Sequence, residues 1–299
     1  MNAVLLKEKA RSFGADLIGI APVERFKDVP ADKNPLSVFP ECKSVIVVAR
    51  RVLRGSIRGI EEGTNFNSTY GFFGYRALED NFLSKMTYDL TCWIEEQSYE
   101  AVPLFAYHDA GMPKGVPVEP GKPAPNVIVD FEFAAHAAGL AEMGLGKFVL
   151  TPEYGTRQRF ALILTDAELD ADKVRSKSIC GDCKACIDAC PLKAYNTEKI
   201  EKFGMKGNEM DVMSVDFALC DSCPNGATRA PGRGIQPDRI AAACGRACMV
   251  QLEKNDKCSN KFENKFRKRK PWALDIMKKP IEDSTVLDAS SRIGCGKKN

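Results

Sequence analysis

Short apolar runs punctuate the first part of the chain at regular intervals. Continuous runs of this length are typical of strands that are buried on both faces, and they occupy residues 16–21, 44–49 and 160–165. A further run over residues 101–107 contains Pro103, which cannot donate a ladder hydrogen bond and therefore indicates an edge strand. The pattern predicts a sheet whose central strands are covered on both sides.

A different spacing lies between these runs and indicates helices. Side chains four residues apart lie on one face of a helix. Such a spacing connects Leu78, Phe82, Met86, Leu90 and Ile94. We predict a helix over residues 77–96 and shorter helices over residues 2–13 and 131–143, the last ending at Gly144. The mixture of helices and strands predicts an α/β sandwich.

The length of 299 residues favours about two domains. We place the α/β domain at residues 1–170, a cysteine-rich module at residues 171–255 and a basic C-terminal tail at residues 256–299. Hydrophobic residues make up 44% of the chain and charged residues 28%, as in ordinary globular proteins. The net charge of +3 favours neither a nucleic-acid partner nor an acidic one.

The N-terminal segment contains lysine and arginine among its apolar residues and has no apolar core of signal-peptide length. The longest apolar runs are strand-sized, far shorter than a membrane span. We therefore expect a cytoplasmic protein that does not contact a membrane. Twelve cysteines in a reducing compartment point to metal ligation rather than to disulfides.

Eight of the twelve cysteines are concentrated in one segment. The run CGDCKACIDACP, which ends at Pro191, has the C-x2-C-x2-C-x3-C-P spacing of bacterial ferredoxins, in which the fourth cysteine binds a different cluster. Two [4Fe–4S] clusters need eight thiolates. We assign the first cluster to Cys180, Cys183, Cys186 and Cys248. We assign the second to Cys190, Cys220, Cys223 and Cys244.

Structural zinc is the alternative for these cysteines, but zinc sites usually combine two separated CxxC pairs rather than a triple run ending in CP. The remaining cysteines have other expected roles. Cys42 and Cys92 are interpreted as small core residues. Cys258 and Cys295 have no partner at a useful spacing.

A glycine-rich segment over residues 139–159, GLAEMGLGKFVLTPEYGTRQR, precedes the last predicted strand. Its glycines permit tight turns and close approach to a ligand. The segment does not contain G-x-G-x-x-G, so a dinucleotide fold is not predicted. A helix end followed by a turn explains the same residues equally well.

The segment GLAEMGLGK, followed by TPEYG at residues 151–155, Arg159 and the ferredoxin run, resembles the reductive dehalogenase and epoxyqueuosine reductase group. The resemblance implies a nitroreductase-like α/β sandwich, followed by a bacterial ferredoxin-like 2[4Fe–4S] module. In that group the clusters pass electrons to a corrinoid (cobalamin-like) cofactor, and flavin is the alternative here. The cofactor-binding residues implied by the resemblance are Gly139, Gly144, Gly146, Lys147, Thr151 and Tyr154.

This chain departs from the group in several motifs. The arginine- and glycine-rich tyrosine motif is only echoed in YGFFGYR at residues 70–76, and Asp130 and Glu132 lie near the position of an acidic residue without matching its spacing. A proton donor could still come from the tyrosines, histidines and acids of the α/β domain. The catalytic candidates are Tyr70, Tyr75, Tyr107, His108 and Asp130. His136, in an apolar helical stretch, is expected to be a packed core residue.

The sequence therefore predicts an iron–sulfur oxidoreductase that acts on a small substrate. Its expected partners are an electron donor of the ferredoxin or flavodoxin type and either a small-molecule substrate or a redox partner protein. The alternative is a non-catalytic electron carrier or reductive activator of a separate corrinoid or flavin protein. The tail KFENKFRKRK could bind RNA, but we expect a solvated helix whose phenylalanines pack on the body, and no nucleic-acid partner.

Overall fold

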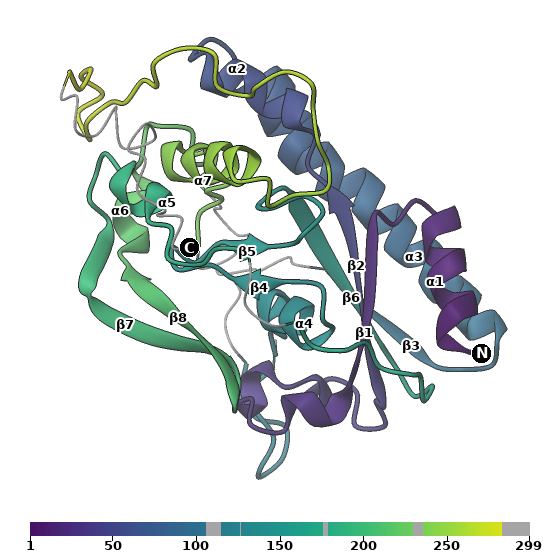
Figure 1. The fold of residues 1–299 in the computed structure, drawn as a ribbon. Coiled ribbons are helices and arrows are strands. Elements are labelled where there is room, and N and C mark those ends of the chain that lie inside the picture. Colours follow the sequence, from purple (N-terminus) through teal and green to yellow (C-terminus); the bar gives the residue numbers. More distant parts are fainter. Residues whose placement is uncertain (106–114, 126, 176–178, 230–235, 283–299) are drawn as a thin grey trace, which may run out of the picture.

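A computed structural model describes residues 1–105, 115–125, 127–175, 179–229 and 236–282. Its largest sheet has four antiparallel strands in the order β1-β2-β6-β3 (Figure 1). The strands are β1 (Leu17–Pro22), β2 (Ser44–Arg51), β3 (Ala101–Leu104) and β6 (Gln158–Thr165). The strands predicted at residues 16–21, 44–49 and 160–165 are confirmed. The strand predicted at residues 101–107 is confirmed as far as Leu104, and it lies at the sheet edge as Pro103 indicated; residues 106 and 107 lie outside the described residues.

The main sheet is covered by helices on both faces. Side chains alternate along β2, so that Ile46 and Val48 point to one core and Val45 and Val47 to the other. Helices α1 (Ala3–Ser12) and α3 (Ser84–Glu96) pack on the first face, and α4 (Phe131–Ala137) packs on the second (Figure 1). This arrangement explains why the central strands are apolar throughout.

The predicted helix over residues 77–96 is confirmed, but its first part is π-helical. Two π-helical segments, η5 (Asn67–Arg76) and η6 (Leu78–Leu83), lead into α3. Leu78 and Leu83 are buried, whereas Phe82 is 48% exposed. The core-facing step from Leu78 to Leu83 is five residues long, which fits the wider turn of a π-helix.

The helix predicted over residues 131–143 is wrong in its second half. Helix α4 ends at Ala137, and Gly139 adopts a left-handed conformation with φ of 70°, which ends helices readily. A Cβ atom at Gly139 would lie 2.2 Å from the Lys173 carbonyl oxygen. The chain continues as a short hairpin of β4 (Glu142–Met143) and β5 (Val149–Leu150).

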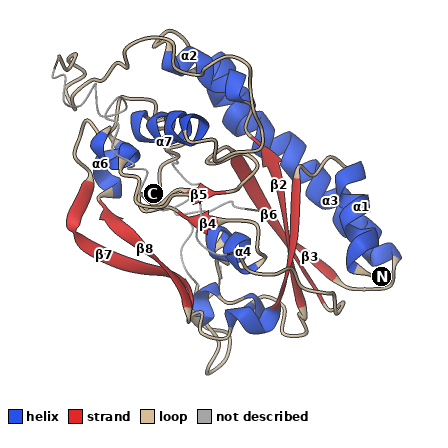
Figure 2. Cartoon of the chain, in the orientation of Figure 1, coloured by secondary structure: helices blue, strands red, loops and turns tan. Residues whose placement is uncertain are grey.

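The cysteine-rich module combines helices with a long hairpin that was not predicted. The helices are α5 (Ala185–Asp188), α6 (Phe217–Asp221) and α7 (Ala243–Lys254). The hairpin of β7 (Tyr195–Met205) and β8 (Asn208–Val215) lies apart from the main sheet (Figure 2). Its far end packs against α4 through Phe203 and Phe133, whose ring centroids are 6.4 Å apart.

Residues 256–282, which we call the strap, run across α2 (Arg58–Glu61) and α7 without forming a helix (Figure 1). The expected tail helix is therefore wrong within these residues, but Phe266 packs on the body with 1% of its surface exposed. Short 3₁₀ turns complete the described part of the chain: η1 (Val23–Phe26), η2 (Ala31–Lys33), η3 (Pro35–Ser37) and η4 (Arg54–Ile57).

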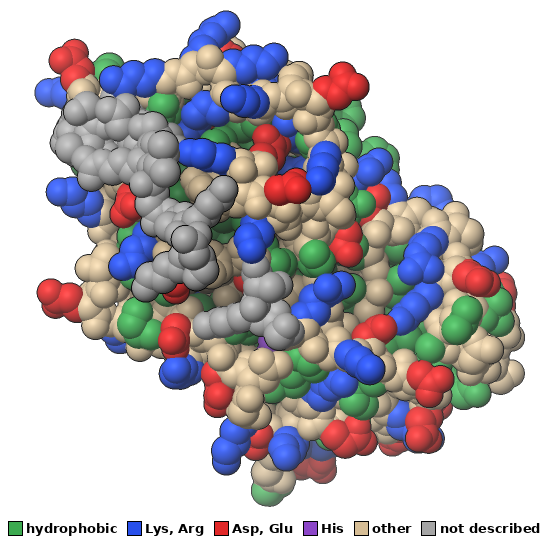
Figure 3. All heavy atoms as spheres, in the orientation of Figure 1, with side chains coloured by type: hydrophobic (Ala, Val, Ile, Leu, Met, Phe, Trp, Pro, Cys, Tyr) green, Lys and Arg blue, Asp and Glu red, His purple; other side chains and the backbone are tan. Residues whose placement is uncertain are grey.

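None of the helices in the described ranges has the length and apolar character needed to cross a bilayer. Lys and Arg side chains are interspersed with Asp and Glu over the face shown in Figure 3. This mixture agrees with the small net charge of the sequence.

Candidate metal centre

Four cysteines line one cavity in the cysteine-rich module. The cavity is lined by Cys190, Cys220, Cys223 and Cys244. Apart from these cysteines, Tyr195 and Arg239, the lining side chains are apolar. The four cysteines therefore line a common space.

The other four cysteines form a second group. Burial raises the pKa of the Cys248 thiol, and Cys186, Cys180 and Cys183 add to this shift because their charges act on the same site. Burial also raises the pKa of Cys186, with Cys180, Cys244 and Cys183 as neighbours. The two groups are thus adjacent, and each contains one cysteine from α7.

Local structure explains how these cysteines meet. Cys244 and Cys248 lie four residues apart on α7, so that their side chains share one helix face. Pro191 directs the chain away from Cys190. The β7–β8 hairpin then returns the chain to α6, which carries Cys220.

Several N–H groups donate to cysteine sulfurs. Leu145 N is 3.4 Å from Cys180 Sγ and Ala194 N is 3.3 Å from Cys190 Sγ. The Asn225 side chain donates to Cys223 Sγ over 3.6 Å. Such donors favour the thiolate form, which is the form that binds metal.

No group of three or more His, Cys, Asp or Glu side chains within the described ranges converges closely enough to hold one metal ion. The C-x2-C-x2-C-x3-C-P spacing of the sequence is what favours iron–sulfur clusters over tetrahedral zinc here. The ligand roles of the eight cysteines stay predictions.

Arg239 lies between the second cysteine group and the glycine-rich segment. Its guanidinium donates to the Tyr195 hydroxyl over 2.9 Å, to Gly146 O over 3.2 Å and to Lys147 O over 2.7 Å. Burial opposes its charge, but Tyr195 and the neighbouring cysteines hold the pKa of Arg239 above its usual value. A permanent cation is therefore fixed beside the cavity.

The glycine-rich segment packs tightly against the cysteines. A Cβ atom at Gly146 would lie 2.5 Å from Cys186 Sγ, and one at Gly144 would lie 3.4 Å from Cys180 Sγ. Lys147 has a left-handed backbone with φ of 53°, and its Nζ lies 2.7 Å from Glu201 Oε2. The glycines therefore allow the backbone to lie close to cysteine sulfurs.

Thr151 and Tyr154 form a turn beside this segment. The fully buried Thr151 hydroxyl donates to Gln158 Oε1 over 3.1 Å and accepts from Tyr154 N over 3.2 Å. Gly139 lies against Lys173, as described above. The cofactor-binding role expected of these residues and of the glycines stays a prediction.

Two acids lie at the start of α4. Asp130 caps the helix, because its Oδ1 accepts from Glu132 N and Phe133 N over 2.9 Å each. Burial raises the pKa of Glu132 to about 7; Asp130 adds to the shift, while Arg239 and Lys147 oppose it. The sequence pattern did not favour Glu132 as a catalytic candidate, since the cations that surround it are distant along the chain.

Tyr70 and Tyr75 belong to a buried network centred on Arg159. Tyr70 donates to Asp238 Oδ2 over 2.6 Å and accepts from Arg159 Nη2 over 2.9 Å, and Arg159 pairs with Asp238 over 2.7 Å. The Tyr75 ring lies 5.0 Å from the Arg159 guanidinium. Burial raises the pKa of Tyr70 well above its usual value, so the network is suited to holding η5 against the cysteine-rich module.

The other candidates have mixed outcomes. Tyr107 and His108 lie outside the described residues, as does Cys295. His136 is buried, with Nδ1 3.2 Å from Ala141 O, so its predicted place in the core is confirmed. Cys42 is also buried, whereas Cys92 and Cys258 are half-buried.

No family model matches the chain. A segment of 68 residues is 43% identical to the tetrachloroethene reductive dehalogenase of Desulfitobacterium hafniense, covering 22% of this chain and 12% of that protein. A segment of 160 residues is 42% identical to the epoxyqueuosine reductase of Synechococcus sp. strain CC9605, covering 53% of this chain and 46% of that protein. Segments of the chain are thus similar to both groups of reductases. The resemblance noted in the sequence is thereby confirmed.

A solved reductive dehalogenase shares the fold. Its structure matches with a TM-score of 0.54 and 16% sequence identity, over 87% of this chain and 32% of the dehalogenase. The matched segments span less than half the length of the two curated reductases. The homology therefore supports a mixed helix and sheet fold of the reductase type.

Proposed function

We propose that this protein is an iron–sulfur oxidoreductase. Electrons would pass through two [4Fe–4S] clusters to a corrinoid on the N-terminal domain, for reductive chemistry on a small substrate. The observation that carries this proposal is the gathering of eight cysteines into two adjacent groups of four. The names of the relatives, which are reductases, support the same reaction class.

The residues present fit two clusters. Cys180, Cys183, Cys186 and Cys248 would hold the first, and the four cysteines of the cavity would hold the second. Bound clusters supply one-electron transfer. The protein contributes N–H donors to the sulfurs and a fixed cation, Arg239, beside the second group.

A corrinoid would be expected beside the glycine-rich segment. The solved dehalogenase that shares the fold is associated with B12-dependent dehalogenation, which supports a cofactor of this class over flavin. Because Gly144 and Gly146 contact the first cysteine group, an acceptor held by this segment would lie close to an electron source. A nitroreductase-like domain at residues 1–170, a ferredoxin-like module at residues 171–255 and a basic tail complete the proposal.

The acids of α4 are well suited to supply a proton. Glu132 has a pKa of about 7 and lies within the electrostatic range of Lys147 and Arg239, so it can hold or release a proton near neutral pH. Asp130 orients the start of the helix through its cap. Full turnover by the three variants Tyr70→Phe, Tyr75→Phe and Tyr107→Phe would remove the tyrosines from the catalytic candidates.

The second candidate function is an electron carrier or reductive activator for a partner corrinoid or flavin protein. The buried network around Tyr70 favours it, because the hydroxyl is already committed to Asp238 and Arg159. A ferredoxin or flavodoxin would supply electrons under either proposal. That nucleic acid is not a partner stays a prediction.

The deciding experiment measures iron, sulfide, cobalt and flavin per chain in protein purified without oxygen. About eight irons with one cobalt per chain would support the corrinoid reductase. About eight irons without cobalt or flavin, even after incubation with cobalamin, would favour the electron carrier. An iron content near zero, with zinc in its place, would refute both.

A further inference from the structure

Asn225 is a buried amide that connects the strap to a cysteine of the second group. Its side chain has no exposed surface. Nδ2 donates to Cys223 Sγ over 3.6 Å and to the Leu274 carbonyl over 2.8 Å. The Leu274 N–H donates to Asn225 Oδ1 over 2.6 Å.

The two contacts with Leu274 determine which end of the amide faces the sulfur. An N–H can only donate, so the Leu274 N–H fixes the position of the amide oxygen. The amide nitrogen then has one hydrogen for the Leu274 carbonyl and a second for Cys223. Without the contacts to Leu274, either the oxygen or the nitrogen of the amide could face Cys223.

Further hydrogen bonds hold both the strap and Asn225 close to this contact. Two residues before Leu274, the Trp272 indole donates to the carbonyls of Ile60 and Glu61 over 3.0 and 3.1 Å. Arg246, on α7, donates to the Asn225 carbonyl over 3.0 Å. The backbone and the side chain of Asn225 are therefore both positioned by residues outside its own loop.

We propose that Asn225 is a positioning residue for the second cluster, and that the strap sets the reduction potential of this cluster through Leu274. The inference rests on the proposed function, because it requires a cluster on Cys223. Reduction adds negative charge to a cluster, and an N–H donor to a ligand sulfur stabilises that charge. Loss of the donor therefore makes the potential more negative.

The test is a redox titration of the full chain with both clusters, prepared without oxygen and followed by electron paramagnetic resonance. Asn225→Ala removes the donor, and Leu274→Pro removes the N–H that orients it. Leu274→Ala is the matched control, because it changes the same side chain but keeps the N–H. We expect Asn225→Ala and Leu274→Pro to make the reduction potential behind one of the two signals more negative by about 59 mV. This corresponds to an about tenfold change in the equilibrium constant for one-electron reduction.

The control should titrate like the unaltered protein, and the other signal should not move in any variant. Unchanged potentials in Asn225→Ala and Leu274→Pro, with both clusters present, would overturn the inference and leave the proposed function intact. Equal shifts in Leu274→Pro and Leu274→Ala would also overturn it, because packing would then be the cause.

If Asn225→Ala cannot hold the cluster, the two Leu274 variants still test whether the strap sets the reduction potential, since their cysteines and Asn225 are intact. A chain that binds fewer than two clusters before any substitution would overturn both the inference and the proposed function.

Discussion

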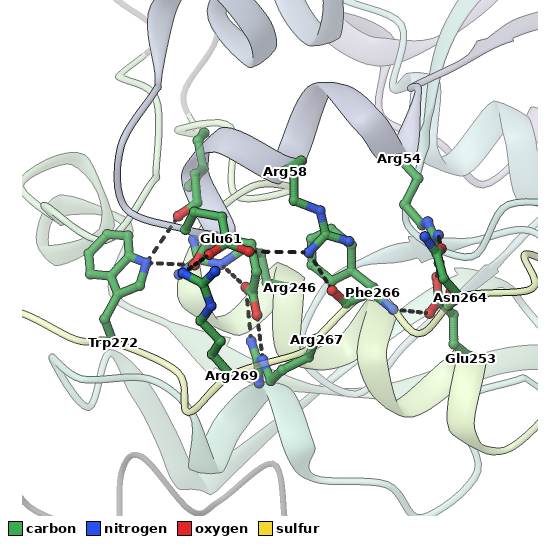
Figure 4. Close-up of polar contacts among 12 residues, drawn as sticks. Arg54, Arg58, Glu61, Arg246, Glu253, Asn264, Phe266, Arg267, Arg269 and Trp272 are labelled. Carbon is green, nitrogen blue, oxygen red and sulfur yellow. Dashed lines mark hydrogen bonds and ion pairs between the residues drawn. The ribbon is translucent and has the colours of Figure 1, made fainter.

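The strap is fastened to α2 by a buried carboxylate, Glu61. Its Oε2 lies 2.8 Å from Arg246 Nε and its Oε1 lies 2.6 Å from Arg267 Nε (Figure 4). The side chains of Glu61 and Arg246 are 6% and 1% exposed. Burial lowers the pKa of Arg246, and Glu61 acts against this shift.

Glu61→Gln should therefore be strongly destabilising. It leaves Arg246 as a buried charge without its carboxylate, a change that typically costs about 3–5 kcal/mol. The measurement is the free energy of unfolding in urea, followed by circular dichroism. Tryptophan fluorescence provides a second signal, because Trp272 lies on the strap beside Arg246, 5.0 Å from its guanidinium.

The adjacent residue provides a matched control. Glu62 pairs with Arg269 over 2.7 Å, but the Arg269 side chain is 79% exposed, and exposed pairs contribute about 0–1 kcal/mol. Glu62→Gln should thus change the free energy of unfolding only slightly. If Glu61→Gln costs no more than Glu62→Gln, the reasoning that burial makes the Glu61 pairs strong is refuted.

Three further changes test other parts of the structure. Gly146→Ala places a methyl group against Cys186 and should lower the bound iron by about half, whereas Gly55→Ala, whose Cβ would have no atom within 4 Å, should not. Tyr70→Phe should cost about 1–3 kcal/mol in thermal or urea unfolding, because a buried acceptor loses its donor; an unchanged midpoint would argue against the network. The raised pKa of Glu132 means that the folded state binds a proton more tightly than the unfolded state, so stability falls as pH rises from about 4.5 to about 7. Glu132→Gln should flatten this slope, worth about 1–2 kcal/mol after allowance for partial exposure, and an unaltered pH profile would contradict the assignment.

The strands of the main sheet could be predicted because each is marked by a run of consecutive apolar residues. The runs over residues 44–49 and 160–165 are apolar at nearly every position, and β2 and β6 are indeed buried on both faces. The end of α4 was missed because Gly139 could also have been an interior helix residue. Only its left-handed φ and the nearby Lys173 carbonyl, 34 positions further along the chain, make it a terminator.

Other features could not be predicted because they depend on tertiary neighbours. The β7 strand is largely exposed, so it lacks the apolar alternation that would reveal a hairpin. Glu132 gains its raised pKa from burial and from Asp130, against Lys147 and Arg239, and two of these neighbours lie far away in the sequence. The metal site, by contrast, could be predicted from the cysteine spacing, because the geometry of the ligands around a cluster limits how far apart the cysteines can lie in the sequence.

Helix α7 has a consequence for how the protein is assembled. One face carries Cys244 and Cys248, a ligand for each proposed cluster, while Arg246 reaches from the helix to Glu61 of α2. Neither set of four thiols is complete until this helix docks, and the Arg246–Glu61 pair links its docking to α2. Iron loading should therefore be cooperative, with both clusters inserted in a late step and singly loaded chains rarely populated.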